Sequence, residues 1–196
     1  MTTEIVRSRG RPRGFDPEAA VETARKLFHA RGYDAVSVAD LTRALGINPP
    51  SFYAAFESKA GLYARILDRY AEAGAIPLHR ILRADRPLAE SLAEVLTEAA
   101  RAYASDPAAP GCMVLEGTRS NDADARAAAR VFHVAAQEVI RDFIAARKPE
   151  EADRLADFVS TTMAGMSASA RHGQSLDRLL ATARLAGTAL ALALAG

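Results

Sequence analysis

The chain has 196 residues, of which 49% are hydrophobic and only 6% aromatic, and its formal net charge is +1 at pH 7. This length allows one or two compact units, and the near-neutral charge excludes a polycation, so nucleic-acid binding would need a local basic patch. The single cysteine, Cys112, excludes an intrachain disulfide framework and is consistent with a reducing cytoplasm.

Residues 1–13 are predicted to form a flexible basic arm. Four arginines alternate there with serine, glycine and proline: Arg7, Arg9, Arg11 and Arg13. The run from Arg9 to Arg13 resembles the core of an AT-hook, whose arginines lie along a narrow A·T minor groove. Two interpretations stay open, because the arm either enters the minor groove or is a tail that adds only salt-dependent affinity.

Four helices are predicted to follow the arm, and each starts at a capping residue. They begin at Asp16, Ser37, Asn48 and Ser58, residue types whose side chains cap a helix N-terminus. The second and third form a helix-turn-helix over about residues 37–56, with Gly46 in the tight turn. The third helix would then enter the major groove, with Phe52 and Phe56 packed inward.

Longer amphipathic helices are predicted beyond residue 74. They cover about 87–103, 122–144, 149–171 and 175–194, and a short one starts at Cys112. We therefore predict an all-α fold of about nine helices, with a three-helix DNA-binding head inside residues 14–74 and a larger helical domain over 75–196. The last uncharged apolar stretch, residues 185–195, is shorter than the ~20 residues of a membrane span, and no secretory signal is evident. A cytoplasmic protein without a membrane partner is expected.

The run SVADLTRALGINPPSFYAAFESKAGLY, from Ser37 to Tyr63, resembles the N-terminal domain of TetR/AcrR regulators. The resemblance covers about residues 14–74 and implies a dimeric repressor that binds a palindromic operator in double-stranded DNA and is released by a small molecule. It places Ser37, Tyr53 and Lys59 where relatives touch phosphates. It places a second set at or near the groove-facing surface: Thr42, Arg43, Asn48, Pro49, Pro50 and Ser51.

This sequence departs from the family pattern at the start of the predicted recognition helix. Pro49 and Pro50 stand where many relatives have a basic residue and a glycine, and proline donates no hydrogen bond. The alternative function is therefore a small-molecule-binding protein that keeps the fold but binds DNA poorly. A helical enzyme is a third hypothesis, but no catalytic motif supports it.

In the family, the C-terminal region holds a ligand pocket, and the last two helices form the homodimer interface. Inward-facing candidates for an unknown effector are Leu96, Tyr103, Cys112, Met113, Phe132, Met163 and Met166. Each of them is alternatively a simple core residue, and the last helix alternatively packs within its own chain. Cys112 is interpreted as a buried hydrophobe, with a thiol sensor as the alternative. The four histidines are far apart, so neither a metal site nor a cofactor is predicted.

Overall fold

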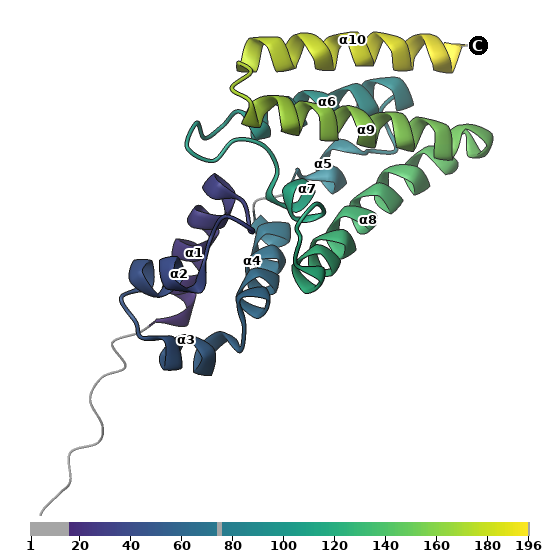
Figure 1. The fold of residues 1–196 in the computed structure, drawn as a ribbon. Coiled ribbons are helices and arrows are strands. Elements are labelled where there is room, and N and C mark those ends of the chain that lie inside the picture. The colour runs from purple at the N-terminus through teal and green to yellow at the C-terminus, as the bar shows by residue number, and fades with distance from the viewer. Residues whose placement is uncertain (1–15, 74–75, 196) are drawn as a thin grey trace, which may run out of the picture.

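The computed structural model describes residues 16–73 and 76–195, and every regular element in these ranges is a helix (Figure 1). The all-α prediction is therefore confirmed for this part of the chain. The arm predicted for residues 1–13, with Arg9, Arg11 and Arg13, lies outside the described residues.

The first four helices begin where the capping residues predicted. The Asp16 side chain caps α1 (Pro17–Arg31), and Ser37 forms a capping box with Asp40 at the start of α2 (Val38–Leu45). The Asn48 side chain accepts a hydrogen bond from the Ser51 amide at the start of α3 (Pro49–Phe56). Ser58 Oγ accepts from the Gly61 amide, 2.9 Å away, at the start of α4 (Lys59–Ala73). Each such cap is worth about 1 kcal/mol, so local chemistry sets these boundaries.

The turn between α2 and α3 requires glycine. Gly46 has φ +64°, a left-handed conformation in which a Cβ is strained. The Gly46 amide donates to carbonyls of the last turn of α2, and this closes that helix so that α3 can cross it.

The remaining helices form the body of the molecule. They are α5 (Leu78–Ile81), α6 (Leu88–Tyr103), α7 (Met113–Gly117), α8 (Ala123–Ala145), the 3₁₀ helix η1 (Pro149–Glu151), α9 (Ala152–Arg171) and α10 (Leu176–Ala195). Within the described ranges there are thus ten α-helices, where about nine were predicted. The addition is α5, a single turn with no side-chain cap, and so without a capping signal. Pro149 opens η1, and the α-helix expected from there begins at Ala152.

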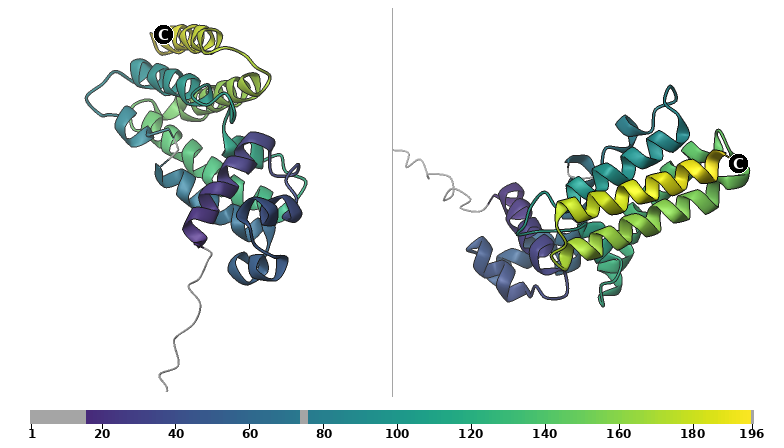
Figure 2. Two further views of the ribbon diagram at one scale, coloured as in Figure 1. Left: turned by 90° about the vertical axis from the view of Figure 1, so that its left-hand side faces the viewer. Right: turned by 90° about the horizontal axis from the view of Figure 1, so that it is seen from above.

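Two hydrophobic clusters hold the fold together. One joins α1–α4 and continues into α7 and the start of α8 through Met113, Val114, Ala125 and Ala129. The other joins α5, α6, α8, α9 and α10. Figure 1 shows α10 lying along α6 and α9, with α8 crossing beneath them toward the head, and Figure 2 shows the same three helices side by side from above. The head core thus extends beyond residue 74, because α7 and α8 cover the side of it that α1–α4 leave open.

Candidate functional site

The outer surface of α3 and the turn before it carries five of the residues predicted to contact DNA. Phe52 and Phe56 are fully buried and fix the rotation of α3 against the head core. On its other side Asn48, Pro49, Pro50, Ser51 and Tyr53 are exposed, and so are Ser37 at the start of α2 and Arg43 in the last turn of α2. Tyr53 is 49% exposed, a large value for an aromatic side chain, and its ring packs edge-on against Phe52.

Some polar atoms of this surface are already used within the head. The Asn48 side-chain oxygen accepts from the Ser51 amide, which leaves the Asn48 amide NH₂ for another acceptor. The Ser37 hydroxyl donates to the Asp40 carboxylate at 2.7 Å. Arg43, 3.3 Å from the other Asp40 oxygen, has a side chain that is 78% exposed, so its guanidinium can reach solvent or a ligand.

Thr42 does not lie on this surface, contrary to the predicted groove-facing position. It is buried, and its hydroxyl donates to the Ala39 carbonyl at 3.2 Å. The rotation of α2 explains the difference, because Leu41 and Thr42 share the buried face of this helix while Arg43 points out.

Lys59 has a structural role that the sequence did not reveal. Its ammonium donates to the carbonyls of Tyr33 (3.0 Å) and Val36 (2.9 Å) and lies 3.9 Å above the centre of the Tyr33 ring. Burial lowers the pKa of this ammonium, and the Asp34 and Asp122 carboxylates oppose that effect. Two of its three N–H donors are thus used to hold α4 against the α1–α2 connection.

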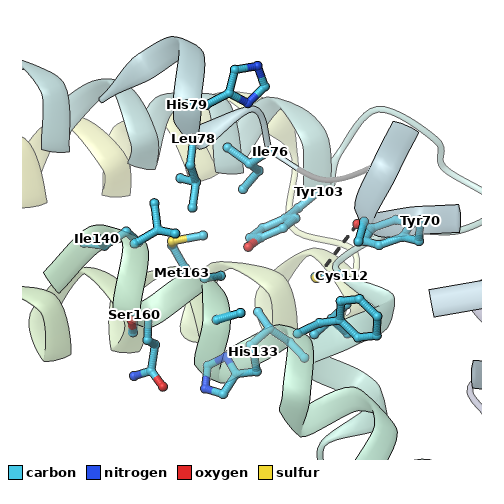
Figure 3. Close-up of a pocket in the computed structure, with 18 residues that line it drawn as sticks. Tyr70, Ile76, Leu78, His79, Tyr103, Cys112, His133, Ile140, Ser160 and Met163 are labelled. Atoms are coloured by element: carbon cyan, nitrogen blue, oxygen red, sulfur yellow. Dashed lines mark hydrogen bonds between the residues drawn. The ribbon is translucent and has the colours of Figure 1, made fainter. Parts of the chain in front are cut away.

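A cavity of about 370 Å³ lies in the body between α4, α5, α6, α8 and α9. It is lined by eighteen residues, most of them apolar. Figure 3 shows these walls, which come from the same helices and from α7, with His79 at the edge and directed away from the centre. Its volume is at the lower end of the range for small-molecule sites, about 300–1,000 Å³. The cavity is therefore suited to a small ligand.

Four of the seven predicted pocket residues line this cavity: Tyr103, Cys112, Phe132 and Met163. Leu96 and Met166 do not line it and lie in the body core, and Met113 lies in the head core. Helical periodicity identifies inward-facing residues but cannot tell a packed core from a cavity wall. The walls that were missed include Tyr70, Ile76, Leu78, Val114, His133 and Ser160, and of these only Tyr70 lies in a helix of the predicted head.

The chain is similar in sequence to known bacterial transcription regulators. Residues 20–66 match the model for bacterial regulatory proteins of the tetR family. The chain is 53% identical over 97% of its length to the HTH-type transcriptional repressor BdcR of Escherichia coli, of which the match covers 96%. It is 34% identical over 96% of its length to the E. coli repressor ComR, covering 93% of that protein.

The chain belongs to the TetR family. It is a DNA-binding transcriptional regulator and not an enzyme. Among solved structures, a cysteine mutant of the TetR-family regulator CifR, complexed with 26-bp double-strand operator DNA, superposes with a TM-score of 0.82 at 31% identity. That match covers 91% of this chain and 99% of the other.

In this TetR-family chain, residues 111–122, here called the α7 segment, connect the head to the cavity. On the head side, the His29 ring nitrogen lies 3.1 Å from the Gly111 carbonyl, and the Tyr63 hydroxyl donates to the Met113 carbonyl at 3.1 Å. Asp34 accepts hydrogen bonds from Ser120 and Asn121. On the body side, Cys112, Val114 and Leu115 are cavity walls. One short segment thus contacts both regions.

Cys112 lies in this segment, in surroundings that keep its thiol protonated. The Tyr70 hydroxyl is 3.9 Å from its sulfur, and burial raises the thiol pKa above its ordinary value. A reactive sensor cysteine needs the opposite, a lowered pKa and solvent access. The structure therefore favours the interpretation of Cys112 as a wall residue. Among the described residues no group of three or more His, Cys, Asp or Glu side chains is placed to hold a metal ion.

The outer side of α9 and α10 exposes large apolar side chains. Leu185 and Leu192 are each 73% exposed, and Phe158 on α9 is 39% exposed. A shallow groove between the two helices is lined by Phe158, Thr161, Ala189 and Ala193 among others. By length and composition alone α10 would also pass as a membrane span, but its buried face packs on α6, where Gly187 would bring an added Cβ within 3.0 Å of Ala93.

Proposed function

We propose that this regulator is a cytoplasmic repressor that binds a palindromic operator as a homodimer and is released by a small molecule. Residues 14–74 would serve as the DNA-binding head and residues 75–196 as the effector and dimerisation domain. The observation that carries the proposal is the course of α4, which has Lys59 in the head at one end and Tyr70 in the cavity wall near the other.

The proposed DNA contacts divide by chemistry. Ser37, Tyr53 and the remaining donor of Lys59 would contact phosphates, because hydroxyls and cations bind phosphate oxygens without reading sequence. Arg43, Asn48 and Ser51 keep hydrogen-bonding atoms for base edges, and Pro49 and Pro50 offer apolar contact, for example with a thymine methyl group. Arg9, Arg11 and Arg13 would add charge near the head. Thr42 would not contact DNA and would contribute only to the packing of α2 in the head.

The apolar outer faces of α9 and α10 are proposed to pair with the same faces of a second chain. The exposed Leu185, Leu192 and Phe158 side chains would leave water in such an interface, which stabilises association by about 25 cal/mol per Å² of apolar surface. Two heads held in this way can read two half-sites of a palindrome one helical turn of DNA apart.

Ligand release would follow from the shared walls of the cavity. A molecule that fills the cavity contacts Tyr70 on α4 and Val114 on the α7 segment, and both elements also pack in the head. A ligand shifts an equilibrium only if it binds one state better than the other. We infer that the ligand-bound state holds α4 in a position that spaces the two heads incorrectly for the operator.

Selection from a random double-stranded DNA pool tests the DNA-binding part of the proposal. The wild type is expected to enrich a palindrome. Arg43→Ala should weaken binding to it by about 1–3 kcal/mol if the lost contact is to a base, or reduce the salt slope by about 1 if it is to a phosphate. Tyr53→Ala should weaken binding with an unchanged salt slope, because the tyrosine hydroxyl carries no charge.

Arg83→Ala is the matched control for Arg43→Ala. Both arginines are exposed and pair with a nearby aspartate, but Arg83 lies beside Arg147 at the far end of α8 and not in the head. Equal operator binding by Arg43→Ala, Arg83→Ala and the wild type would show that Arg43 does not contact the DNA. Failure of the wild type to enrich any sequence at low salt would favour the alternative, a ligand-binding protein whose prolines at the start of α3 leave too few donors.

A further inference from the structure

The cavity walls contain no charged side chain. None of its eighteen lining residues is Asp, Glu, Lys or Arg, and its polar groups are hydroxyls, imidazoles, one amide and one thiol. Burial lowers the pKa of the imidazolium of His133, which favours the neutral ring, and His79 is exposed at the cavity edge. A charged ligand would lose its hydration here without gaining an opposite charge, which is costly.

Tyr103 differs from the other buried or half-buried tyrosines of the described chain. The hydroxyl of Tyr33 donates to Asp122, that of Tyr63 to the Met113 carbonyl, and that of Tyr70 to the Cys112 sulfur. Tyr103 is only 2% exposed, yet within the described residues its hydroxyl has no hydrogen-bond partner. The Tyr103 oxygen is not one of the fully enclosed polar atoms that lack a partner, so it faces the open space of the cavity. An acceptor placed in that space can receive its hydrogen bond.

The position of this hydroxyl explains the missing partner. Figure 3 shows the Tyr103 ring in the middle of the cavity, with its oxygen directed toward the side where Met163, Leu78 and Ile140 lie and away from the Tyr70–Cys112 pair. These three side chains are apolar. A second hydroxyl in the wall, that of Ser160, also has no hydrogen-bond partner among the described residues, and its oxygen is likewise not fully enclosed.

We propose that the cavity binds an uncharged, mainly apolar small molecule with a carbonyl-type acceptor oxygen, and that the Tyr103 hydroxyl donates the hydrogen bond that orients it. This inference rests on the proposed function in that the same cavity is the effector site. The phenol acts as the donor because it stays protonated, since burial raises its pKa well above the ordinary value. The apolar walls account for the rest of the ligand, as in most small-molecule sites.

The experiment uses four probes of one shape and different polarity. Acetophenone carries a carbonyl oxygen, α-methylstyrene replaces that oxygen with CH₂, benzoate carries a negative charge, and phenyltrimethylammonium a positive one. Dissociation constants are measured by ligand-observed NMR with the full chain, in the absence of DNA. The wild type should bind acetophenone about five- to tenfold more tightly than α-methylstyrene, the factor that one hydrogen bond is worth, and should bind both ions more weakly than acetophenone.

Two variants assign the preference to one hydroxyl. Tyr103→Phe should remove the five- to tenfold preference and leave the affinity for α-methylstyrene unchanged. Tyr70→Phe is the matched control, because it removes a hydroxyl from the same cavity that is already paired with Cys112, and it should keep the preference. The wild-type probe series needs no variant, so the ligand class is tested even if Tyr103→Phe does not fold.

Several results would overturn the inference. They are tighter binding of benzoate or phenyltrimethylammonium than of acetophenone, equal loss of ketone and hydrocarbon affinity in Tyr103→Phe, or no binding of any probe up to its solubility limit. Because the titration contains no DNA, a failure of operator binding would leave its outcome unchanged. Conversely, a wrong ligand class would leave operator binding and dimerisation standing.

Discussion

The head and the body of this regulator present their functional groups in opposite directions. In the head, short capped helices bury Phe52 and Phe56 and turn Arg43, Asn48 and Tyr53 outward. In the body, long helices enclose the cavity and direct the Tyr103 hydroxyl inward. A surface that binds an extended polyanion has to be exposed, while a site for an apolar ligand has to exclude water.

The two regions are nevertheless not independent. The α7 segment supplies cavity walls and also hydrogen bonds to His29, Asp34 and Tyr63 of the head. The head core itself includes Met113 and Val114. The difference between the regions therefore lies in what they are proposed to bind, and their stabilities are expected to be coupled.

The largest expected effect is a loss of stability in α3, where a buried residue and an exposed residue lie next to each other in the sequence. Phe52→Ala removes a fully buried ring and should lower the free energy of unfolding by about 3–5 kcal/mol. Tyr53→Ala, at the next position, removes only a half-buried ring that packs edge-on against Phe52, so it should lower this free energy by about 1 kcal/mol while weakening operator binding. Urea unfolding and a DNA titration measure the two quantities. A similar loss of stability in both variants would contradict the assigned rotation of α3.

The head could be predicted from the sequence because local signals determine its structure. Its helices begin at Asp16, Ser37, Asn48 and Ser58, and one of its turns depends on Gly46, so residues a few positions apart decide the structure. Two details depended on distant residues and were missed. The burial of Thr42 depends on the packing of α2, and the internal role of Lys59 depends on carbonyls at Tyr33 and Val36.

The cavity was harder to predict because its walls come from six helices. Helical spacing identified Tyr103, Phe132 and Met163 as inward-facing, and they line it. The same spacing also selected Leu96 and Met166, which face the same interior but are covered by neighbouring helices. An inward-facing side chain either packs against its neighbours or lines a cavity. Which of the two occurs depends on how helices distant in sequence cross, and no local sequence pattern shows this.

The next largest effect is expected at the outer face of the body. Leu185→Asp combined with Leu192→Asp places two charges in the proposed dimer interface and should weaken dimerisation by about 2–4 kcal/mol. The helix content of the double variant, measured by circular dichroism where it is monomeric, should match that of the wild type, because both leucines are 73% exposed. Analytical ultracentrifugation measures the dimer. Val131→Asp is the control, since Val131 is 66% exposed but lies on α8, and the same dissociation in this control would count against the assigned face.

A smaller effect is expected in the α7 segment, where head and body meet. A Cβ added at Gly117 would overlap the Tyr63 hydroxyl and come within 2.8 Å of Ala129 Cβ. Gly117→Ala should therefore lower the free energy of unfolding by about 1–3 kcal/mol, as overpacking does. Adding Tyr63→Phe removes the overlapping oxygen and should restore part of this loss, relative to Tyr63→Phe alone. Additive losses in a double-mutant cycle would show that the two residues are not in contact.

The smallest effect is a pH dependence at the same junction. Burial, together with the charges of Arg171 and Arg25, lowers the pKa of His29 below its ordinary value, and the hydrogen bond to the Gly111 carbonyl opposes this. Below about pH 6.5 the His29 imidazole is therefore protonated in the unfolded chain but still neutral in the folded chain. The free energy of unfolding should therefore fall as the pH drops through 6.5, and level off below the folded pKa. Burial also lowers the pKa of His133, which adds to the pH dependence of the wild type. The contribution of His29 is therefore measured as the difference between the wild type and His29→Gln. Urea unfolding between pH 7.5 and 5.5 should show a shallower slope for His29→Gln than for the wild type, and equal slopes would mean that protonation of His29 does not loosen this junction.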